Sequence, residues 1–384
     1  MKRILIVSNH MNVGGIQKAL LELLKALAKR SDYEVSLFCC KRSGAFLEKI
    51  PSEITVLPEN PYALMSEQAL SQCKRQGFKY FFLRALFALW SKWFTKALPS
   101  KILCRLVGKI GSSYDVAISY SQPIADRNFC NLTNEIVLNC VRAPKKITFV
   151  HCDFASYGGN SACNRRLYRK FDAIAAVSDS VRKQFCNILP ELSDKTLTVR
   201  NCCDQDEILA LANTNAVSYT RTAFVTVARL SEEKGLLRCV PIFAALKSEG
   251  FSFEWHIVGG GPLEDILRDE IARYSLEKSV FLEGEQLNPY RFMRYADFFF
   301  LPSFHEAAPV VFDEAYALNV PILATKTLSA IEMVEARGIG LVCENSTEDI
   351  CAMLRRVLTE KLSFSFSPAS QNETCIAQFN ALCD

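Results

Sequence analysis

The sequence predicts an α/β protein made of two Rossmann-like domains, and three observations support this fold class. The chain has 384 residues, enough for two domains that each bury a core of their own. Its first residues read as strand, glycine turn, helix and strand, which is the pattern of a βαβ unit in a parallel sheet. A second alternating series of strand and helix patterns begins near residue 222.

The elements of the first domain follow from residue pattern and spacing. The apolar run at 3–9 predicts a buried strand, the pair Gly14-Gly15 predicts a turn, and the apolar residues of 16–30 recur at helical spacing. Further apolar runs predict strands at 33–40, 116–120, 146–151, 173–178 and 196–201. We therefore assign residues 1–203 to the first domain.

The second domain is expected from the same kind of pattern. The small and polar segment 204–220 is the expected linker, 221–365 form the domain, and 366–384 form a loop with a terminal helix. Two parallel sheets suit a ligand at the carboxyl ends of their strands, in a cleft between the domains. Strands are expected at 223–230, 254–260, 280–284, 298–303 and 321–325.

Composition narrows the class of protein. Apolar residues make up 49% of the chain and charged residues 22%, as in soluble globular proteins. No run reaches the ~18 apolar residues of a spanning helix, and the first ten residues read as a strand rather than a signal peptide. The 16 cysteines include no C-x-x-C pair, and the adjacent pairs Cys39-Cys40 and Cys202-Cys203 lack the spacing of a disulfide or metal framework. We expect free thiols in a reducing cytosol.

Charge is divided unevenly along the chain. Residues 1–203 hold 30 Lys and Arg against 15 Asp and Glu, whereas residues 204–384 hold 15 against 26. The balances of +15 and −11 predict that the first half meets an anionic partner.

A basic and aromatic segment at 74–109 accounts for much of this asymmetry. No acidic residue occurs from Gln68 to Tyr114. The pattern favours a helix that lies in an anionic membrane interface. A core helix with solvated lysines is the alternative, and nucleic-acid binding is a more distant one. The residues expected at the membrane are Lys79, Arg84, Trp90, Lys92, Trp93 and Lys96.

Two glutamates flank a predicted helix start in the second domain. Glu306 precedes Pro309, which suits a first helical turn because its missing N–H costs nothing there, and Glu314 lies about a turn and a half further on. The free N–H groups near 309–311 and the positive end of the helix dipole favour an anion. The two carboxylates can accept hydrogen bonds from hydroxyl groups, so a sugar phosphate would suit this place. Taken alone, the stretch also fits two solvated surface acids.

Other candidates lie where predicted strands end. Arg229 and Lys234 share one turn and could clamp a diphosphate, although each alone also fits a surface charge. The turns at Gly14-Gly15 and Gly260 allow close backbone approach to a ligand, but neither has G-x-G-x-x-G spacing, and a plain tight turn is the alternative. His151 ends a strand and is either a site residue or a structural histidine.

In chain order, these features resemble retaining glycosyltransferase family 4, whose fold is called GT-B. The resemblance covers nearly the whole chain and is most specific over 223–343. The Glu-x7-Glu pair, Glu306 and Glu314, is the hallmark of that family. The segments that carry the resemblance are "ARLSEEKG", "IVGGGP", "FLEGEQ", "ADFFFLPSFHEAAPVVFDEAYALNVPILAT" and "GIGLVCEN".

The resemblance implies a nucleotide-diphosphate sugar as donor, with a UDP- or GDP-sugar as the candidates. Glu306 would hold hydroxyls of the donor sugar and Glu314 the ribose. Arg229 and Lys234 would neutralise the leaving diphosphate, so that neither a metal nor a cofactor is needed. The remaining groups implied near the donor are His151, Gly14, Gly15, Gly260 and the backbone N–H groups of Ala308, Val310 and Val311.

The resemblance also implies a place and a pathway. We expect a cytoplasmic enzyme, peripheral at the inner face of the cell membrane, that builds polysaccharide or glycolipid on a saccharide or lipid-linked acceptor and binds no nucleic acid. The terminal helix would cross back to the first domain. The alternatives are a non-catalytic nucleotide-sugar or membrane-binding protein, a sugar-nucleotide epimerase, and a phosphorylase, which would need a lysine-held pyridoxal cofactor.

The chain departs from the family pattern at a few positions. Ala307 and Asn319 stand where glycine is usual, Leu328-Ser329 replaces a glycine pair, and Gln17 replaces an acid. These departures bear on the choice of donor more than on donor binding.

Overall fold

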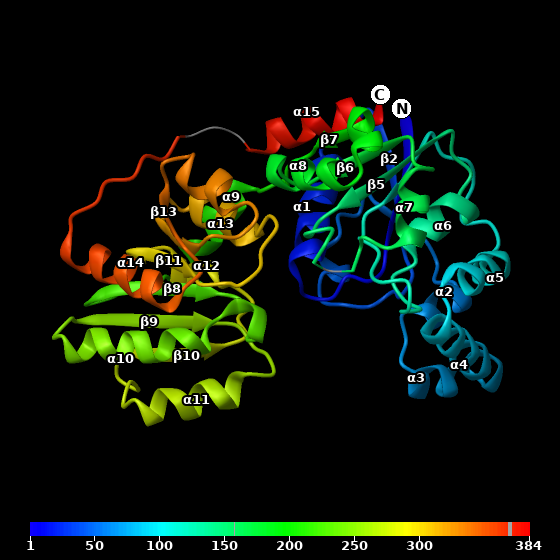
Figure 1. The fold of residues 1–384 in the computed structure, drawn as a ribbon. Helices are drawn as coiled ribbons and strands as arrows, with labels where there is room; N and C mark the ends of the chain where they lie inside the picture. The colour runs from blue at the N-terminus through cyan, green and yellow to red at the C-terminus, as the bar shows by residue number, and fades with distance from the viewer. Residues whose placement is uncertain (157, 368–370) are drawn as a thin grey trace. The chain divides into compact units, whose positions relative to one another are not determined.

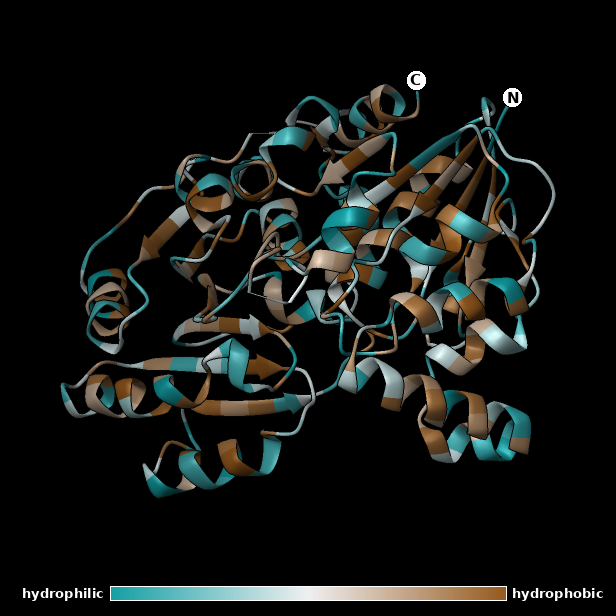
Figure 2. Ribbon diagram, turned by 45° about the vertical axis from the view of Figure 1, so that its right-hand side comes forward, coloured by the Kyte–Doolittle hydropathy of each residue, from teal (hydrophilic) through white to brown (hydrophobic). Residues whose placement is uncertain are grey.

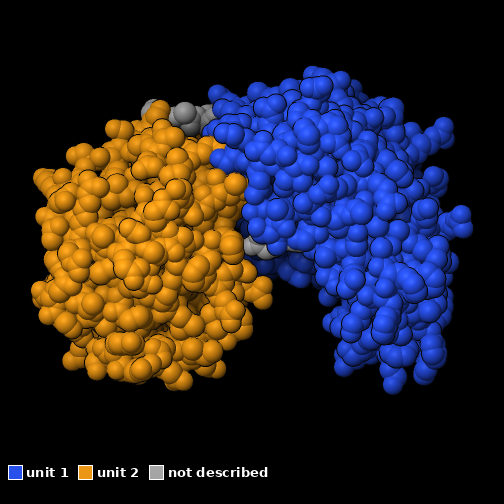
Figure 3. Space-filling view, in the orientation of Figure 1, with its two compact units in different colours: residues 1–202, 370–384 blue, residues 203–369 orange. Residues whose placement is uncertain are grey.

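The computed structural model describes residues 1–156, 158–367 and 371–384, and the chain forms two compact units (Figure 3). Unit 1 comprises residues 1–202 and 370–384, and unit 2 comprises 203–369. Residues 368–370 of the expected carboxyl-terminal segment lie outside the described residues. The expected linker holds α9 (Gln205–Ala212), which buries Ile208 and Ala212 in the core of unit 2. Most of that segment is therefore part of the second unit.

Unit 1 is built on a parallel sheet of seven strands in the order β3-β2-β1-β4-β5-β6-β7 (Figure 1). The central strand β1 is apolar and buried, with Ile4 paired between Val35 and Val116. This burial on both faces is typical of parallel strands covered by helices. The strands are β1 (Lys2–Ser8), β2 (Tyr33–Cys39), β3 (Thr55–Val56), β4 (Val116–Ser119), β5 (Lys145–Val150), β6 (Ala173–Ala176) and β7 (Thr196–Thr198).

The helices of unit 1 include a cluster between β3 and β4, of which α3 and α4 project furthest from the sheet (Figure 1). That cluster is α2 (Pro61–Ser66), α3 (Leu70–Gln76), α4 (Phe78–Trp93) and α5 (Ala97–Val107). The others are α1 (Gly15–Ala28), α6 (Thr133–Cys140), α7 (Ala162–Tyr168), α8 (Asp179–Ile188) and α15 (Gln371–Cys383), with short helices η1 (Leu47–Lys49) and η2 (Pro190–Lys195).

Unit 2 has a parallel sheet of six strands in the order β10-β9-β8-β11-β12-β13. Its strands are mostly apolar, whereas its helices mix apolar and polar residues (Figure 2). The strands are β8 (Thr222–Val227), β9 (Phe253–Val258), β10 (Val280–Gly284), β11 (Phe298–Leu301), β12 (Ile322–Thr325) and β13 (Gly340–Cys343). Besides α9, the helices are η3 (Glu232–Lys234), η4 (Leu237–Cys239), α10 (Val240–Ser248), α11 (Glu264–Arg273), α12 (Tyr290–Met293), α13 (Val310–Ala317), η5 (Ile331–Glu335) and α14 (Thr347–Thr359).

Both sheets have the Rossmann strand order, so the predicted fold class of two Rossmann-like domains is confirmed. Counted within each unit, the order is 3-2-1-4-5-6, with a seventh strand added at the end in unit 1, and the chain changes direction across the sheet between the first and fourth strands. Loops that follow these two strands diverge and leave a place for ligands at the carboxyl edge. In unit 2 these are the loops after β8 and β11.

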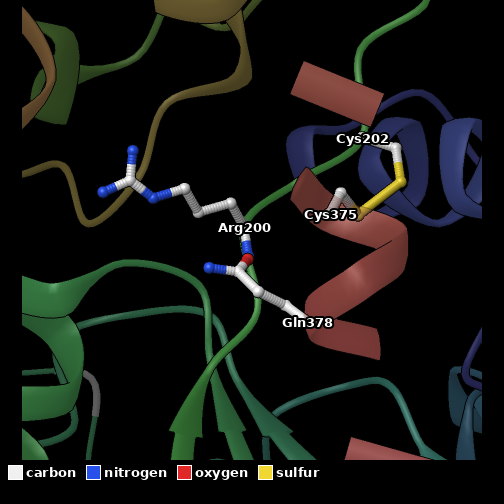
Figure 4. Close-up of a disulfide and its surroundings, with 4 residues drawn as sticks. All are labelled: Arg200, Cys202, Cys375 and Gln378. Atoms are coloured by element: carbon white, nitrogen blue, oxygen red, sulfur yellow. A yellow bond between two sulfur atoms is a disulfide. The ribbon is translucent and has the colours of Figure 1, made fainter. Parts of the chain in front are cut away.

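The terminal helix α15 belongs to unit 1, as expected. Tyr33 donates a hydrogen bond to Asn380 Oδ1 at 2.7 Å, and its ring meets Phe379 edge-on. The backbone N–H of Arg200 donates to Gln378 Oε1 at 2.9 Å (Figure 4). The return of the last helix to the first domain is therefore confirmed.

One expectation about the cysteines is wrong, because Cys202 forms a disulfide with Cys375 (Figure 4). The other 14 cysteines are free. The bond joins the segment after β7 to α15, and its two cysteines lie 173 residues apart. The adjacent pair Cys202-Cys203 gave no indication of it, because only the fold brings Cys375 to Cys202.

Candidate functional site

Glu306 lies in the loop between β11 and α13 and is anchored through one carboxylate oxygen. Its Oε1 accepts hydrogen bonds from Lys234 Nζ at 2.5 Å and from Ser303 Oγ at 2.8 Å. The side chains of Glu306 and Lys234 are only 12% and 20% exposed, so water screens this ion pair less than a surface pair. No hydrogen bond to Oε2 is found among the described residues, and this oxygen can accept from a ligand. Sequence reasoning missed Ser303.

The turn after β8 brings Lys234 to that loop. Gly235 follows with a φ of 65°, and a Cβ there would lie 2.3 Å from the carbonyl oxygen of Pro302. Glycine therefore lets the loops after β8 and β11 touch. Arg229, on the same turn, is exposed, and its side chain forms no ion pair with any residue the structure describes. An exposed cation of this kind is available to an anionic ligand.

Glu314 is buried within α13, with 5% of its surface exposed. Its Oε1 accepts a hydrogen bond from the hydroxyl of Tyr290 at 2.9 Å. Tyr290, on α12, was also missed, because no motif marks a tyrosine in that segment. Pro309 is the N-cap rather than the first helical residue, so the N–H groups of Val310 and Val311 belong to the first turn and have no acceptor within the helix.

The departures from the family pattern are accommodated locally. Asn319 has a φ of 56° just after α13, a conformation in which asparagine is the usual substitute for glycine. Ala307 is buried and has no positive φ, so its backbone suits alanine. The N–H of Leu328 donates to the carbonyl oxygen of Glu306 at 3.2 Å, and Ser329 is buried. The half-buried Ala308 lies between the Glu306 loop and α13.

The glycine turn after β9 packs on the turn that bears Arg229. A Cβ at Gly259 would lie 2.0 Å from the Ala228 carbonyl oxygen, and one at Gly261 would lie 2.4 Å from that of Leu230. These two glycines have the structural role of a tight turn. At Gly260 the nearest atom to a Cβ would be Glu285 Cβ at 3.7 Å, an ordinary contact. The protein itself does not require glycine there.

His151 in unit 1 is buried and neutral. Its ring packs against Tyr120 and Phe149, with ring centroids 4.6 and 5.5 Å away. Burial lowers the pKa of His151 to about 4, and a hydrogen bond to the Tyr120 backbone opposes this shift. Its Nε2 has no hydrogen-bond partner among the described residues. Gln122, which sequence reasoning missed, accepts from the N–H groups of His151 and Cys152, each at 2.8 Å.

The first glycine turn of unit 1 lies at the start of α1. A Cβ at Gly14 would lie 2.7 Å from Gln17 Oε1, whereas one at Gly15 would meet no atom within 4 Å. Gln17 donates a hydrogen bond to Asn9 Oδ1 at 3.3 Å, at the end of β1. Gln17, where the family has an acid, is thus tied to the strand end, and Gly15 stays open.

Helix α4 of the basic segment buries some of its apolar side chains and exposes others. Tyr80 and Phe87 are buried in the core of unit 1. On other faces of α4, Phe82 is 62% exposed and Trp93 is 77% exposed. Phe78, Leu86, Leu89, Trp90 and Phe94 are exposed as well. We call these seven side chains the α4 apolar face.

The cations of this segment fall into two groups. Lys79 and Lys92 are exposed, and Arg84 is half-buried with its Nε donating to the Gln68 carbonyl oxygen. Lys96 is fully buried, donates to the Ile124 carbonyl oxygen and lies 3.7 Å from Glu135 Oε1. The assignment of Lys96 to a membrane surface is therefore wrong, because its charge is used inside unit 1. In the described part of the chain, no helix is both long and apolar enough to cross a bilayer.

The two Rossmann-type sheets are those of the GT-B fold, and the Glu-x7-Glu pair lies on the second of them. Residues 212–372, which are less than half of the chain, match the sequence model of the family described as glycosyl transferases group 1.

Two relatives that match this chain are named as glycosyltransferases, and a solved structure shares its fold. The putative colanic acid biosynthesis glycosyltransferase WcaL of Salmonella typhimurium is 36% identical over 141 residues, which are 34% of this chain and 34% of WcaL. A Campylobacter jejuni N-acetylgalactosaminyltransferase named for a diphospho-undecaprenol-linked saccharide is 26% identical over 66% of this chain and 68% of its own. The crystal structure of Anabaena HepE with UDP has a TM-score of 0.61 and 19% identity, and covers 100% of this chain and 94% of HepE.

The chain thus covers only about a third of the length of WcaL. The HepE likeness concerns the fold alone.

Proposed function

We propose that the protein is a retaining glycosyltransferase that moves a sugar from a UDP- or GDP-sugar to a saccharide or lipid-linked acceptor in cell-surface polysaccharide or glycolipid synthesis. The main support is the contact of Lys234 with Glu306 at the point where the strand order of unit 2 reverses. The relatives are named for polysaccharide synthesis or for a lipid-linked saccharide, and HepE binds UDP.

Each site residue has a role that its surroundings allow. Glu306, held through Oε1, receives hydroxyls of the donor sugar at Oε2. Glu314 with Tyr290 binds the ribose. Lys234 and the exposed Arg229 bind the diphosphate and stabilise the negative charge that grows on it as the sugar leaves.

Backbone groups of unit 2 add to the donor site, and the family resemblance suggests roles toward the donor for His151, Gly14 and Gly15 of unit 1. The N–H groups of Val310 and Val311, with that of Ala308, supply donors for phosphate or sugar oxygens, and Gly15 and Gly260 allow close approach. Gly14 shapes the turn before Gly15. His151 offers Nε2 as an acceptor, because a neutral imidazole carries its proton on one nitrogen and the other nitrogen bonds the Tyr120 backbone.

The reaction proposed here needs no metal. Arg229, Lys234 and the start of α13 supply positive charge where a divalent cation would otherwise act. The departing phosphate takes the proton of the acceptor hydroxyl on the face that the acceptor attacks, so the configuration of the anomeric carbon is retained.

The proposed place of action is the cytoplasmic face of the cell membrane. The α4 apolar face enters the interface, and the nearby lysines meet anionic headgroups. A lipid-linked acceptor would be presented at that surface.

Nucleotide release from a panel of UDP- and GDP-sugars tests the activity. We expect slow release without acceptor, faster release with acceptor, retention of anomeric configuration by NMR, and no effect of a chelator. Tight binding of UDP or GDP without any release would instead indicate the alternative, a non-catalytic nucleotide-sugar binding protein. Strict dependence on a divalent ion would contradict the metal-free mechanism.

Arg229→Ala gives the sharpest test of donor binding, because this side chain is exposed and its loss leaves the fold intact. We expect UDP or GDP affinity to fall by ~1.5–3 kcal/mol, the range for hydrogen bonds to charged groups. Calorimetry on Arg355→Ala, which removes another arginine from unit 2, provides the control. Equal affinities in both variants would refute the role of Arg229.

A further inference from the structure

The loop that bears Glu306 is held through its backbone by side chains from three other segments. The Pro302 carbonyl oxygen accepts a hydrogen bond from Arg238 Nη2 at 2.7 Å. Asn345 Nδ2 donates to the carbonyl oxygens of Ser303 at 3.4 Å and Phe304 at 3.2 Å. Three successive carbonyl groups before Glu306 are thus bound by Arg238 of η4 and by Asn345, which follows β13. The Ser303 carbonyl oxygen also accepts a hydrogen bond from Thr325 Oγ1 of β12 at 2.5 Å.

Arg238 and Asn345 also bind one another. Arg238 Nη2 donates to Asn345 Oδ1 at 2.5 Å, and Nη1 donates to the Asn345 carbonyl oxygen at 3.4 Å. The guanidinium carbon lies 3.9 Å from the centroid of the Phe304 ring, a cation–π distance. The planar fork of arginine can make these contacts together, which a lysine could not.

The chemistry of Arg238 indicates a backbone-holding role. No carboxylate lies within ion-pair distance of it in the part of the chain that the structure describes. Burial lowers its pKa, yet a guanidinium stays charged at neutral pH. Gly235 makes the arrangement possible, since a Cβ there would lie 3.0 Å from Arg238 Nε.

We propose that Arg238 and Asn345 form a clamp that positions Glu306 for the donor sugar, an inference that rests on the proposed function. Lys234 and Arg238 lie on one short segment. Lys234 fixes the carboxylate of Glu306, while Arg238 fixes the backbone that carries it. Ser303 connects the held backbone with the held carboxylate, because its carbonyl oxygen accepts a hydrogen bond from Asn345 and its hydroxyl donates one to Glu306. The clamp sets the distance between the ammonium group and the carboxylate.

This role predicts a specific kinetic signature. A displaced Glu306 lowers the turnover of the donor sugar, whereas the nucleotide contacts of Glu314 and Tyr290 lie outside the clamp and persist. Arg238→Ala and Asn345→Ala should each lower kcat at least tenfold in the nucleotide-release assay and leave UDP or GDP affinity within threefold. Because the two residues act as a unit, the double variant should be little worse than either single variant.

Two conservative variants separate the parts of the clamp. Arg238→Lys keeps the charge but has a single donor nitrogen in place of the arginine fork, so it should recover part of the lost kcat. Asn345→Asp keeps the acceptor for Arg238 but lacks the N–H donors to the loop, so it should be as slow as Asn345→Ala although the Arg238 contact remains. Arg355→Ala, which breaks an exposed ion pair with Glu249, is the control and should match the wild type.

Hydrogen exchange over 302–309 tests the clamp without any need for activity. The amides of this loop should exchange faster in Arg238→Ala and Asn345→Asp than in the wild type or Arg355→Ala. Unchanged exchange, unchanged kcat or an equal loss of nucleotide affinity would overturn the clamp. The proposed function would be overturned if the wild type neither bound UDP or GDP nor released them from sugars. The hydrogen-exchange result would then still show whether Arg238 and Asn345 hold the loop.

Discussion

The carboxylate of Glu306 in unit 2 is hydrogen-bonded to the protein through one oxygen, and its other oxygen is open to a ligand. Lys234 and Ser303 both donate to Oε1 of Glu306, at 2.5 and 2.8 Å. This arrangement fixes the direction of Oε2 and keeps its negative charge beside an ammonium group. Electrostatic stabilisation of a developing positive charge on a sugar needs such a pre-set charge.

Glu306→Gln tests that argument because glutamine keeps the shape and loses the charge. We expect kcat to fall at least about 10²-fold, or about 2.7 kcal/mol, with UDP or GDP affinity nearly unchanged. Glu344→Gln, which removes an exposed carboxylate of unit 2 paired with Lys326, should behave like the wild type. Near-wild-type turnover of Glu306→Gln would exclude the catalytic role of this residue.

His151 makes the stability of unit 1 depend on pH. Its pKa in the fold is about 4, below the ordinary histidine value of 6.5, so the unfolded chain binds more protons between these pH values. The contribution of neutral His151 to the free energy of unfolding is therefore fully present above pH 6.5. This contribution falls as the pH drops towards 4, by at most about 2–3 kcal/mol. His151→Gln should lose this component. Urea unfolding at pH 7 and 4.5 measures it, and the same pH dependence in variant and wild type would contradict the assignment.

At the scale of elements, α15 is attached to the rest of unit 1 by a disulfide near its start and an ion pair near its end. Lys2 pairs with Asp384 at 2.8 Å near its end, and Cys375 is bonded to Cys202 near its start. The helix is only weakly amphipathic in sequence, so these attachments matter for its docking.

We expect removal of the disulfide to loosen α15. Cys375→Ser, or reduction of the wild type, should lower the free energy of unfolding of unit 1 by about 2–4 kcal/mol, the usual value of a native disulfide. Thiol titration of the unfolded, oxidised protein should give 14 thiols. Cys351→Ser, at a half-buried free cysteine, is the control. A count of 16 thiols without reductant would show that the bond does not form.

The sequence predicts the strands well for a physical reason. Buried parallel strands are continuous apolar runs, and the expected runs at 3–9, 33–40 and 254–260 coincide with β1, β2 and β9. The two-residue β3 is too short to give such a signal. The segment 204–220 was expected to be a linker because it is polar and small, yet Ile208 and Ala212 are enough to dock α9.

The candidate site was predictable only where residues lie close in sequence. Glu306, Glu314 and the turn with Arg229 and Lys234 belong to local motifs. The contacts that hold them do not, since Tyr290 and Asn345 reach the site through tertiary packing. The burial of Lys96 follows from packing too: nothing in a basic, aromatic stretch shows which lysine turns inwards.

At the scale of the whole molecule, charge and apolar surface coincide in the first half of the chain. Residues 1–203 have a balance of +15, and the acid-free segment 68–114 carries the α4 apolar face. The buried Lys96 is not part of that surface. Lys74, Arg75, Lys79 and Lys92 are exposed and can meet headgroups, each contributing ~1 kcal/mol before screening.

The wild type should therefore sediment with anionic liposomes and not with neutral ones, and salt should release part of it. Replacing Lys74, Arg75, Lys79 and Lys92 together with Gln should abolish sedimentation, because long-range attraction is lost, while nucleotide binding in unit 2 is unchanged.

The double variant Phe82→Ser and Trp93→Ser should weaken sedimentation at all salt concentrations, because it removes apolar side chains that would enter the membrane interface. The matched control replaces four exposed cations of unit 2, Lys247, Arg268, Lys278 and Arg356, and should sediment like the wild type. If the fourfold Gln variant of unit 1 sediments fully, or the wild type does not sediment with anionic liposomes, then α4 has only a structural role in unit 1 and the acceptor is a soluble saccharide.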